Sequence, residues 1–398
     1  MDFTPIIPTE LNGNVDQQLL IKAERVCTQS AMLIGTYNIN IINELKVLLR
    51  KVNSYYSNKI ESEGTHPIDI EKAMRKDYST DEKSKNLQLL SLAHIQTQNF
   101  VEKYCLNTNN SPYSKEFILD IHKEFYSQNG LESFLEIKSN DTFIKMIPGE
   151  FRQQNVSIGN HISPAFNDLN INMDRYSNFY KPNKNYTQAL KLIYALSSHH
   201  RLVWIHPFLD GNGRTSRLAL DGCLVNMNLD GYGLWNISRG LARDSEKYKY
   251  NLALADTPRL NDLDGRGALS TKELKKYVNF MLDTALDQVL YMKENLQLST
   301  LSSRIESYVL FSQQGMYKTA PLPKHSNILF KELLVSGELS RGDIKNIIGT
   351  KDRVASSLIK DLIDIDYLKS DTPRGKIRIN FNAHFATQLF PELIPSYS

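Results

Sequence analysis

The chain has 398 residues, which is more than one typical domain, so two or three compact units are expected. Its composition, 41% hydrophobic and 23% charged with a mean hydropathy of −0.38, excludes disorder along the whole chain. A net charge of +3 is too small to indicate a nucleic-acid or membrane partner by itself.

The cysteines and the N-terminus indicate the compartment. Cys27, Cys105 and Cys223 are far apart and odd in number, and no pair has metal-ligand spacing, so a reducing compartment fits. The start MDFTPIIPTEL lacks the basic and apolar regions of a secretory signal. No run of 18 apolar residues occurs. We therefore expect a cytoplasmic protein without a membrane span.

Most of the chain shows the apolar periodicity of helices. The predicted helices, in chain order, cover residues 16–33, 38–61, 82–105, 114–128, 187–203, 214–229, 240–256 and 270–297. A stretch rich in Gly, Asn and Pro at 139–186 interrupts the pattern. We interpret it as an irregular loop with a short hairpin, in which Val156–Ile158 is the best strand candidate.

The end of the chain has its own pattern. The proline-containing segment 317–326 suits a linker. Three helical patterns follow at about 326–336, 340–348 and 352–365, and then two strand-like runs flank the turn 372–375. Helix, helix, helix, hairpin is the order of a winged helix, a variant of the helix-turn-helix motif.

The partner of this C-terminal unit stays open. The helix at 352–365 would be its recognition helix, and Arg374, Lys376 and Arg378 would lie on its wing. However, residues 326–398 contain ten Lys and Arg against nine Asp and Glu, whereas phosphate binding usually needs a clearly basic face. A module that contacts protein, selects a target or forms a homodimer is at least as consistent as a DNA-binding one.

The segment 204–218 reads WIHPFLDGNGRTSRL and has the features of a polyphosphate site. Gly211, Asn212 and Gly213 can curl so that their backbone N–H groups point at one spot. Arg214 and Arg217 are three apart at the start of a helix and therefore share one face. A helix N-terminus with two guanidinium groups is a strong site for phosphates.

Two further residues of this segment carry chemistry. Asp210 is placed to hold Mg²⁺ against the same phosphates, and His206 can act as a base on an incoming hydroxyl. A single His near an Asp is usually structural, and an arginine pair is usually a solvated face. Within twelve residues, however, a base, a carboxylate, a glycine-rich turn and two arginines occur together, so we favour an active site.

This stretch resembles the signature of the Fic family (filamentation induced by cAMP), His-Pro-Phe-x-(Asp/Glu)-Gly-Asn-Gly-Arg-x-x-Arg, at every defined position. Residues 148–152, 199–205 and 235–241 are also similar to Fic proteins of the bacterial type with a C-terminal winged helix. The resemblance extends in pieces from about residue 1 to 385. It implies a mainly α fold, with a Fic-type helical core, a short β-hairpin flap and a small winged-helix domain.

The resemblance also implies an activity, the transfer of AMP from Mg-ATP to a Tyr, Thr or Ser hydroxyl of a target protein or of the enzyme itself. By it, His206 is the general base and Asp210 the Mg²⁺ ligand. The phosphates of ATP would be bound by the glycine-rich turn and by the two arginines, that is, by Gly211, Asn212, Gly213, Arg214 and Arg217.

The resemblance further suggests a built-in inhibitor. Fic proteins carry an inhibitory helix with the pattern (Ser/Thr)-x-x-x-Glu-(Gly/Asn), and Ser57 and Glu61 resemble it, whereas Ser62 departs from the last position. From spacing alone, Glu61 is more often an exposed carboxylate near a helix end. If the pattern holds, Glu61 pairs with Arg217 and keeps it from the γ-phosphate. In some relatives the same Glu supports the removal of AMP.

Weaker indications concern the flap and the adenine. Residues 149–166 occupy the place where Fic proteins carry the flap that aligns the target segment. Tyr248, Tyr250 and Asp256 lie on the helix that borders the adenine in the family, although tyrosines at such spacing are more often core residues.

The chain is thus expected to have four parts: an N-terminal helical region at 1–110 with an inhibitory helix at about 55–62, a Fic core at 111–300, a linker at 301–325 and a winged helix at 326–398. Alternatives to AMP transfer from ATP are AMP removal, transfer from another nucleotide, and a DNA-binding regulator with a silent Fic domain. No Walker A loop occurs, which argues against a P-loop NTPase.

Overall fold

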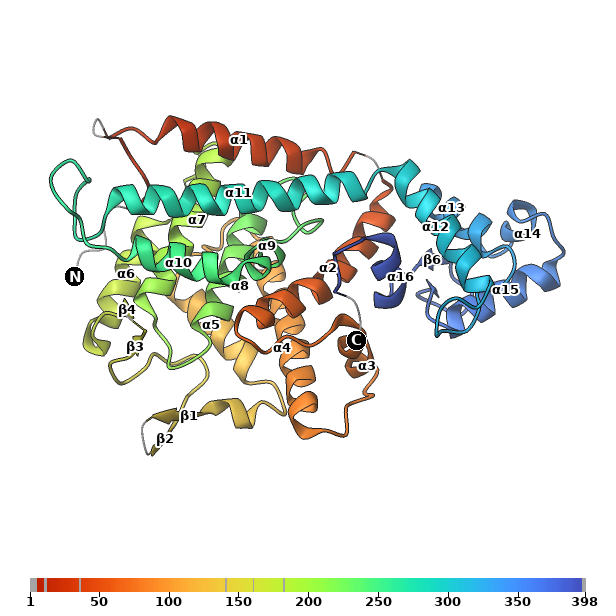
Figure 1. Cartoon of the computed structure of the whole chain (residues 1–398), viewed down its shortest axis with the longest axis horizontal. Coiled ribbons are helices and arrows are strands. Elements are labelled where there is room, and N and C mark those ends of the chain that lie inside the picture. Colours follow the sequence, from red (N-terminus) through yellow and green to blue (C-terminus); the bar gives the residue numbers. More distant parts are fainter. Residues whose placement is uncertain are drawn as a thin grey trace.

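The computed structural model describes residues 6–10, 13–35, 37–139, 142–159, 161–181 and 183–395. The fold is mainly helical, as predicted (Figure 1). The helices before the C-terminal unit are α1 (Gln17–Ala31), α2 (Ile39–Ile60), α3 (Pro67–Met74), α4 (Glu82–Cys105), α5 (Lys115–Tyr126), α6 (Leu169–Phe179), α7 (Gln188–Ile205), α8 (Asn212–Asn226), α9 (Ile237–Arg243), α10 (Ser245–Ala255) and α11 (Thr271–Asn295). Two short 3₁₀ turns occur at Glu132–Leu135 and Phe166–Asp168.

The predicted helices begin where a side chain caps the first turn. Asp16, Asp81 and Ser114 each accept a hydrogen bond from a backbone N–H three residues further on, at 3.1, 2.8 and 3.2 Å. Such caps satisfy donors that the helix itself leaves free. They explain why the starts of α1, α4 and α5 lie within one residue of the sequence prediction.

The core is built around α7 and α8. Nearly every residue of α7 from Ala189 onward is buried, including the polar His199, His200 and Arg201. Helix α8 packs against α7, α4 and α5, while α1 lies along α11 on the outside (Figure 1). A helix buried on most of its faces is held rigidly, so the loop between α7 and α8 has fixed ends.

The segment 139–186 is more ordered than predicted. It contains α6 and parts of two antiparallel hairpins, formed by β1 (Glu136–Ser139) with β2 (Thr142–Lys145) and by β3 (Ser157–Ile158) with β4 (His161–Ile162). The prediction of a short hairpin in this segment is confirmed, and the prediction that the rest is irregular is wrong. Helix α6 is stabilised by burial of Leu169, Met173 and Tyr176 on one face.

Two other boundaries differ from the sequence prediction. The predicted helix at 240–256 is two helices, because the backbone leaves helical geometry at Asp244, which caps α10. The predicted linker at 301–325 is helical in its first half, since α12 spans Leu298–Gln313. Leu301, Ile305 and Tyr308 form a buried stripe against α13 and α16, so this helix belongs to the C-terminal unit.

The C-terminal unit has the predicted order of elements. Its remaining elements are α13 (Ser326–Ser336), α14 (Ile344–Ile347), α15 (Asp352–Asp364), β5 (Leu368–Lys369), β6 (Arg378–Ile379) and α16 (Ala383–Leu389). Strands β5 and β6 pair antiparallel, and Leu339 bridges Ile377 beside them. After the hairpin, α16 and the chain end return to α2 and α3 (Figure 1).

No helix within the described ranges combines the length and the apolar character that crossing a bilayer requires.

Candidate active site

The loop between α7 and α8 is fixed by its own backbone. His206 ends α7 in the left-handed conformation, with φ 51°, and Gly211 precedes α8 with φ 76°. A Cβ on Gly211 would lie 2.5 Å from the Tyr126 ring, so only glycine fits there. The Asn212 side chain closes the loop, since its Oδ1 accepts from the Phe208 N–H at 2.9 Å and its Nδ2 donates to the Phe208 carbonyl at 2.8 Å.

Two buried side chains that the sequence analysis did not single out as site residues anchor this loop. The His122 ring stacks on Phe208, with centroids 3.9 Å apart. Its Nδ1 accepts from Gly149 N–H at 2.9 Å, so its Nε2 carries the proton and donates to the Asp210 carbonyl at 3.3 Å. Arg152 donates from Nε to the His206 carbonyl at 2.8 Å. These contacts hold the loop in one conformation against α5 and the 148–152 segment.

The environment of the His206 imidazole favours its neutral form. Burial, followed by the nearby His161 and Arg152, lowers the pKa of His206 to about 4. A histidine with this pKa is unprotonated at neutral pH and has a free lone pair to accept a proton. Its side chain remains half-buried, so the ring can still be reached.

The first turn of α8 is open to an anion. No side chain caps it. A Cβ on Gly213 would lie 2.2 Å from Oε1 of Glu61, which places that carboxylate directly against the turn. Because the N–H groups and dipole of a helix N-terminus favour negative charge, this position stabilises the Glu61 carboxylate.

Arg217 is bound by the last turn of α2 and by Glu61, which follows it; the pair with Glu61 is the one that the family resemblance implied. Its Nη2 donates to Glu61 Oε1 at 2.7 Å and to the Ser57 carbonyl at 2.9 Å, and its Nε donates to Ser57 Oγ at 3.0 Å. The Arg217 side chain is 2% exposed, against 34% for Glu61. Burial works against ionisation of Glu61, but Arg217 and Arg214 outweigh it, so the pKa of Glu61 lies below its usual value.

Ser62, which departs from the inhibitory pattern, has the backbone conformation that the pattern's Gly or Asn would adopt. Its φ is 65°, in the left-handed region that glycine and asparagine adopt most readily. The backbone after Glu61 therefore turns as a Gly or Asn would turn it.

Arg214 has a carboxylate partner that the sequence analysis missed. Its guanidinium pairs with Glu63 and also donates to the Tyr126 hydroxyl at 2.6 Å and to Asn58 Oδ1 at 3.2 Å. The Arg214 side chain is 4% exposed. Both arginines of the motif are thus bound by acids from one short segment, Glu61 and Glu63. The spacing of two acids just after a helix is the only sequence signal for this pairing.

Asp210 lies exposed at the mouth of the site. Enclosure by the protein and then the charge of Glu61 raise the pKa of Asp210. Among the residues described, no cluster of three or more His, Cys, Asp or Glu could hold a metal ion by itself. Mg²⁺ usually takes only one or two carboxylates together with substrate phosphates, so the donor set around Asp210 fits that ion in the presence of a nucleotide.

The three residues predicted for the adenine side differ in exposure and in contacts. Tyr248 is 2% exposed, and its hydroxyl is 2.7 Å from Nε2 of His199, so it packs in the core. Tyr250 is 63% exposed on α10. Burial raises the pKa of Asp256, but His161 at 2.9 Å and His200 at 3.1 Å outweigh this and leave the pKa at about 2.

Asp256 also contacts the predicted flap through His161. The hairpin of β3 and β4 lies within residues 149–166, where the flap was expected. Its His161 is held by Asp256 through Nδ1 and lies 3.0 Å from the Trp204 carbonyl through Nε2. The ring centroids of His161 and His206 are 6.4 Å apart. The hairpin therefore borders the proposed base.

Two of the wing residues considered for DNA binding already form ion pairs with carboxylates. Arg378 pairs with Asp371 at 2.5 Å and with Glu44 at 3.3 Å, and Lys376 pairs with Glu338 at 2.6 Å. Carboxylates therefore pair with Lys376 and Arg378, two of the three basic residues that the sequence analysis placed on the wing.

The family model and the curated relatives that match this chain both belong to the Fic/DOC group of proteins. Residues 112–224 match the Fic/DOC family. A stretch of 78 residues is 44% identical to Protein adenylyltransferase Fic of Drosophila willistoni, and one of 77 residues is 43% identical to the protein of that name from Culex quinquefasciatus. Each match covers 19% of this chain and 15% of the relative, so it spans only a small part of those proteins.

Solved structures show the same fold. A Fic domain containing signaling protein from Bacteroides thetaiotaomicron has a TM-score of 0.52 at 16% identity, covering 68% of this chain and 95% of that one. Fic-1 from C. elegans has a TM-score of 0.50 at 15% identity, covering 69% and 71%. At these identities the likeness concerns the fold.

Proposed function

We propose that this chain, which carries a Fic/DOC family domain in residues 112–224, is a protein adenylyltransferase that moves AMP from ATP to a hydroxyl of a target protein or of itself. The observation that supports this most is the geometry of one loop. A neutral His206 and an uncapped helix N-terminus with two buried arginines lie within twelve residues.

The residues have separate roles in this reaction. His206 takes the proton of the target hydroxyl, and the hydroxyl oxygen forms a bond to the α-phosphorus of ATP. The bond from that phosphorus to the bridging oxygen breaks, and pyrophosphate leaves. The first turn of α8, with Gly213, binds phosphate through backbone N–H groups. Arg214 and Arg217 bind the β- and γ-phosphates once Glu63 and Glu61 release them.

Asp210 would hold Mg²⁺ together with the nucleotide, and the ion would supply neutralisation of the phosphate charge. Asn212 acts on the loop rather than on phosphate through its side chain, because both of its amide atoms already bind Phe208. It is therefore a positioning residue for His206.

The inhibited state follows from competition for the same positions. Glu61 lies against the first turn of α8 and pairs with Arg217, so a triphosphate must displace it. A pair between a buried arginine and a carboxylate is directional, and removal of the carboxylate frees the cation. The Glu61→Gly variant is therefore expected to transfer AMP faster than the unaltered chain, including onto itself.

The test compares labels and variants. Glu61→Gly protein is incubated with ATP labelled at the α- or the γ-phosphate, and the label on protein is measured. Transfer of AMP predicts α-label only, because pyrophosphate carries the γ-label away. His206→Ala in the same background should lower the rate ~10²–10⁴-fold while ATP binding is retained. Equal rates with and without His206, or γ-label on protein, would disprove the proposal.

Parallel reactions separate the alternatives. Labelled GTP, UTP and CTP show whether another nucleotide is the donor. To test for AMP removal, target protein that already carries labelled AMP is incubated with the unaltered chain or with Glu61→Gly protein. If Glu61 supports AMP removal, only the unaltered chain should release the label.

A further inference from the structure

The inhibitory segment, residues 57–63, is flanked on both sides by residues that contact the far end of the chain. Ser57, Asn58, Glu61 and Glu63, which bind the two arginines, all lie between Tyr56 and His66. The Tyr56 hydroxyl donates to the Leu393 carbonyl at 3.1 Å, and Nε2 of His66 lies 3.0 Å from the Pro395 carbonyl. Residues more than 300 positions away therefore contact both flanks of the inhibitory segment.

This tail, residues 391–395, is itself packed. The Pro391 carbonyl accepts from the Tyr291 hydroxyl at 2.5 Å, and the Glu392 carbonyl accepts from Nε and Nη2 of Arg239 at 3.2 and 3.0 Å. Leu393 and Ile394 are 1% and 3% exposed. Helices α9 and α11 therefore fix the tail, and the tail can restrain what it touches.

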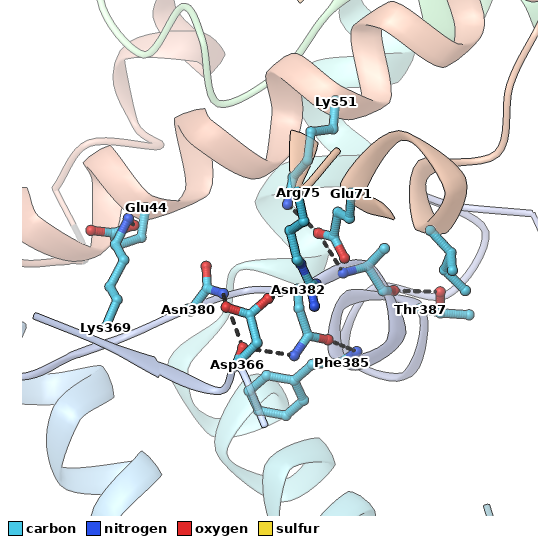
Figure 2. Close-up of polar contacts among 12 residues, drawn as sticks. Glu44, Lys51, Glu71, Arg75, Asp366, Lys369, Asn380, Asn382, Phe385 and Thr387 are labelled. Atoms are coloured by element: carbon cyan, nitrogen blue, oxygen red, sulfur yellow. Dashed lines mark hydrogen bonds and ion pairs between the residues drawn. The ribbon is translucent and has the colours of Figure 1, made fainter. Parts of the chain in front are cut away.

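Charged contacts join the same C-terminal unit to α2 and α3 (Figure 2). Glu44 on α2 is 7% exposed and pairs with Lys369 and Arg378 from the two strands of the hairpin. At the exposed edge, Arg75 pairs with Asp366 at 2.9 Å. These pairs hold the start of α2 and the end of α3.

Near Arg75, on the side away from Glu44 in the view of Figure 2, Glu71 links three elements. It pairs with Lys51 of α2, and its Oε1 accepts from the Ala383 N–H, at the start of α16, at 2.9 Å. Lys51 and Glu71 are only 7% and 12% exposed, and both lie outside the C-terminal unit, so their pair would survive if the unit moved away, whereas the buried Glu71 would lose the bond from the Ala383 N–H.

We infer that the C-terminal unit and its tail are a clamp that sets the strength of inhibition by Glu61 and Glu63. A shift of residues 57–66 relative to α8 would withdraw both carboxylates from the arginines together. Tyr56 and His66 resist this shift as long as they bind the tail. The free energy needed to open the site therefore includes the tail contacts, and displacement of the tail activates the enzyme. The effect on AMP transfer rests on the proposed function, whereas the mechanical clamp does not.

The direct test measures backbone protection, which does not depend on catalysis. Tyr56→Phe removes one donor, and His66→Asn removes the other while keeping a cap for Ile68, whose N–H now bonds to His66. In the double variant, amide hydrogen exchange of residues 57–66 should accelerate by about tenfold or more, while that of α7 stays unchanged. Lys331→Ala, which removes a pair with Glu306 elsewhere in the unit, is the matched control and should change neither.

A second variant guards against a folding defect. Arg75→Glu alters an exposed pair, so the protein should remain folded while the hairpin unit loosens from α3. Exchange of residues 57–66 should accelerate about two- to threefold, in the same direction as in the double variant. Unchanged exchange in both variants would overturn the clamp, whatever the activity of the protein.

Activity then links the clamp to inhibition. The Tyr56→Phe/His66→Asn protein should transfer AMP faster than the unaltered chain, and adding Glu61→Gly and Glu63→Gln should make the clamp substitutions ineffective. Additive acceleration in that background would overturn the inference, because the tail would then act independently of the carboxylates. If Glu61→Gly protein itself transfers no AMP, the proposed function fails, and the exchange measurement still decides on the clamp.

Discussion

Glu63 gives the most discriminating prediction, because only the three-dimensional structure connects it with Arg214. We expect Glu63→Gln to strengthen nucleotide binding, since the substitution keeps the size of the side chain and removes its charge. Arg214 stays in position, because Asn58 and Tyr126 still accept its N–H groups. The change therefore tests competition for the cation rather than the order of the site.

The expected size follows from burial. A hydrogen bond to a charged group contributes about 1.5–3 kcal/mol, and the Glu63 side chain is 31% exposed, so solvent screening reduces the pair to roughly 1–2 kcal/mol. Since 1.4 kcal/mol corresponds to a factor of ten, the Kd for ATP should fall about 5- to 30-fold. Glu61→Gly should have an effect at least as large, because Glu61 also lies against the first turn of α8.

Calorimetric titration with Mg-ATP in a His206→Ala background measures this without self-modification. Glu246→Gln, an exposed acid on α10 whose side chain is 85% exposed, is the control and should leave the Kd unchanged. If Glu63→Gln protein binds ATP no better than the control while its fold is intact, then Arg214 is not a phosphate ligand. The proposal that Glu63 competes with nucleotide for Arg214 is then incorrect.

Three further predictions concern the base, the loop and the wing. In Glu61→Gly protein, kcat/KM should fall as the pH is lowered, with a midpoint at or below about pH 4, because a protonated His206 accepts no proton. A midpoint near pH 6.5, the value of a free histidine, would contradict the buried environment of His206. Gly211→Ala should destabilise the protein by about 1–3 kcal/mol in urea unfolding, through backbone strain and the clash with Tyr126. Gly315, which also has a positive φ but has open space around it, provides the control, and Gly315→Ala should show the backbone strain alone. In gel shifts, the intact chain should bind duplex DNA only weakly and with little salt dependence, because Arg378 is already paired; steep salt dependence would refute this.

The parts of the fold that sequence predicted are those with local signals. Helices α1, α4 and α5 have a capping residue and a long apolar stripe, so their bounds were nearly correct. Helix α3 was missed because its eight residues bury only Pro67, Ile70 and Ala73. Helix α12 was partly taken as linker, although Leu301, Ile305 and Tyr308 follow helical spacing, and these residues form a core only beside α13 and α16.

The candidate site divides in the same way. His206, Asp210 and the arginines are close in sequence, and the resemblance to a family motif located them together. His122 and Glu63 reach the site across 88 and 151 positions, so no spacing rule connects them with it. The tail contributes backbone carbonyls, which every residue has, and therefore leaves no sequence signal at all.

The order in which the clamp is synthesised has a consequence for the newly made protein. Both acids of the inhibitory segment precede the arginine motif in the chain, so the carboxylates are available as soon as the arginines fold. Pro395, however, follows Arg217 by 178 residues. At ~5–20 residues per second, roughly 9–36 seconds pass on the ribosome between the two. In the proposed scheme, a nascent chain would be inhibited but unclamped for at most that interval, and modification of the chain itself would be concentrated there.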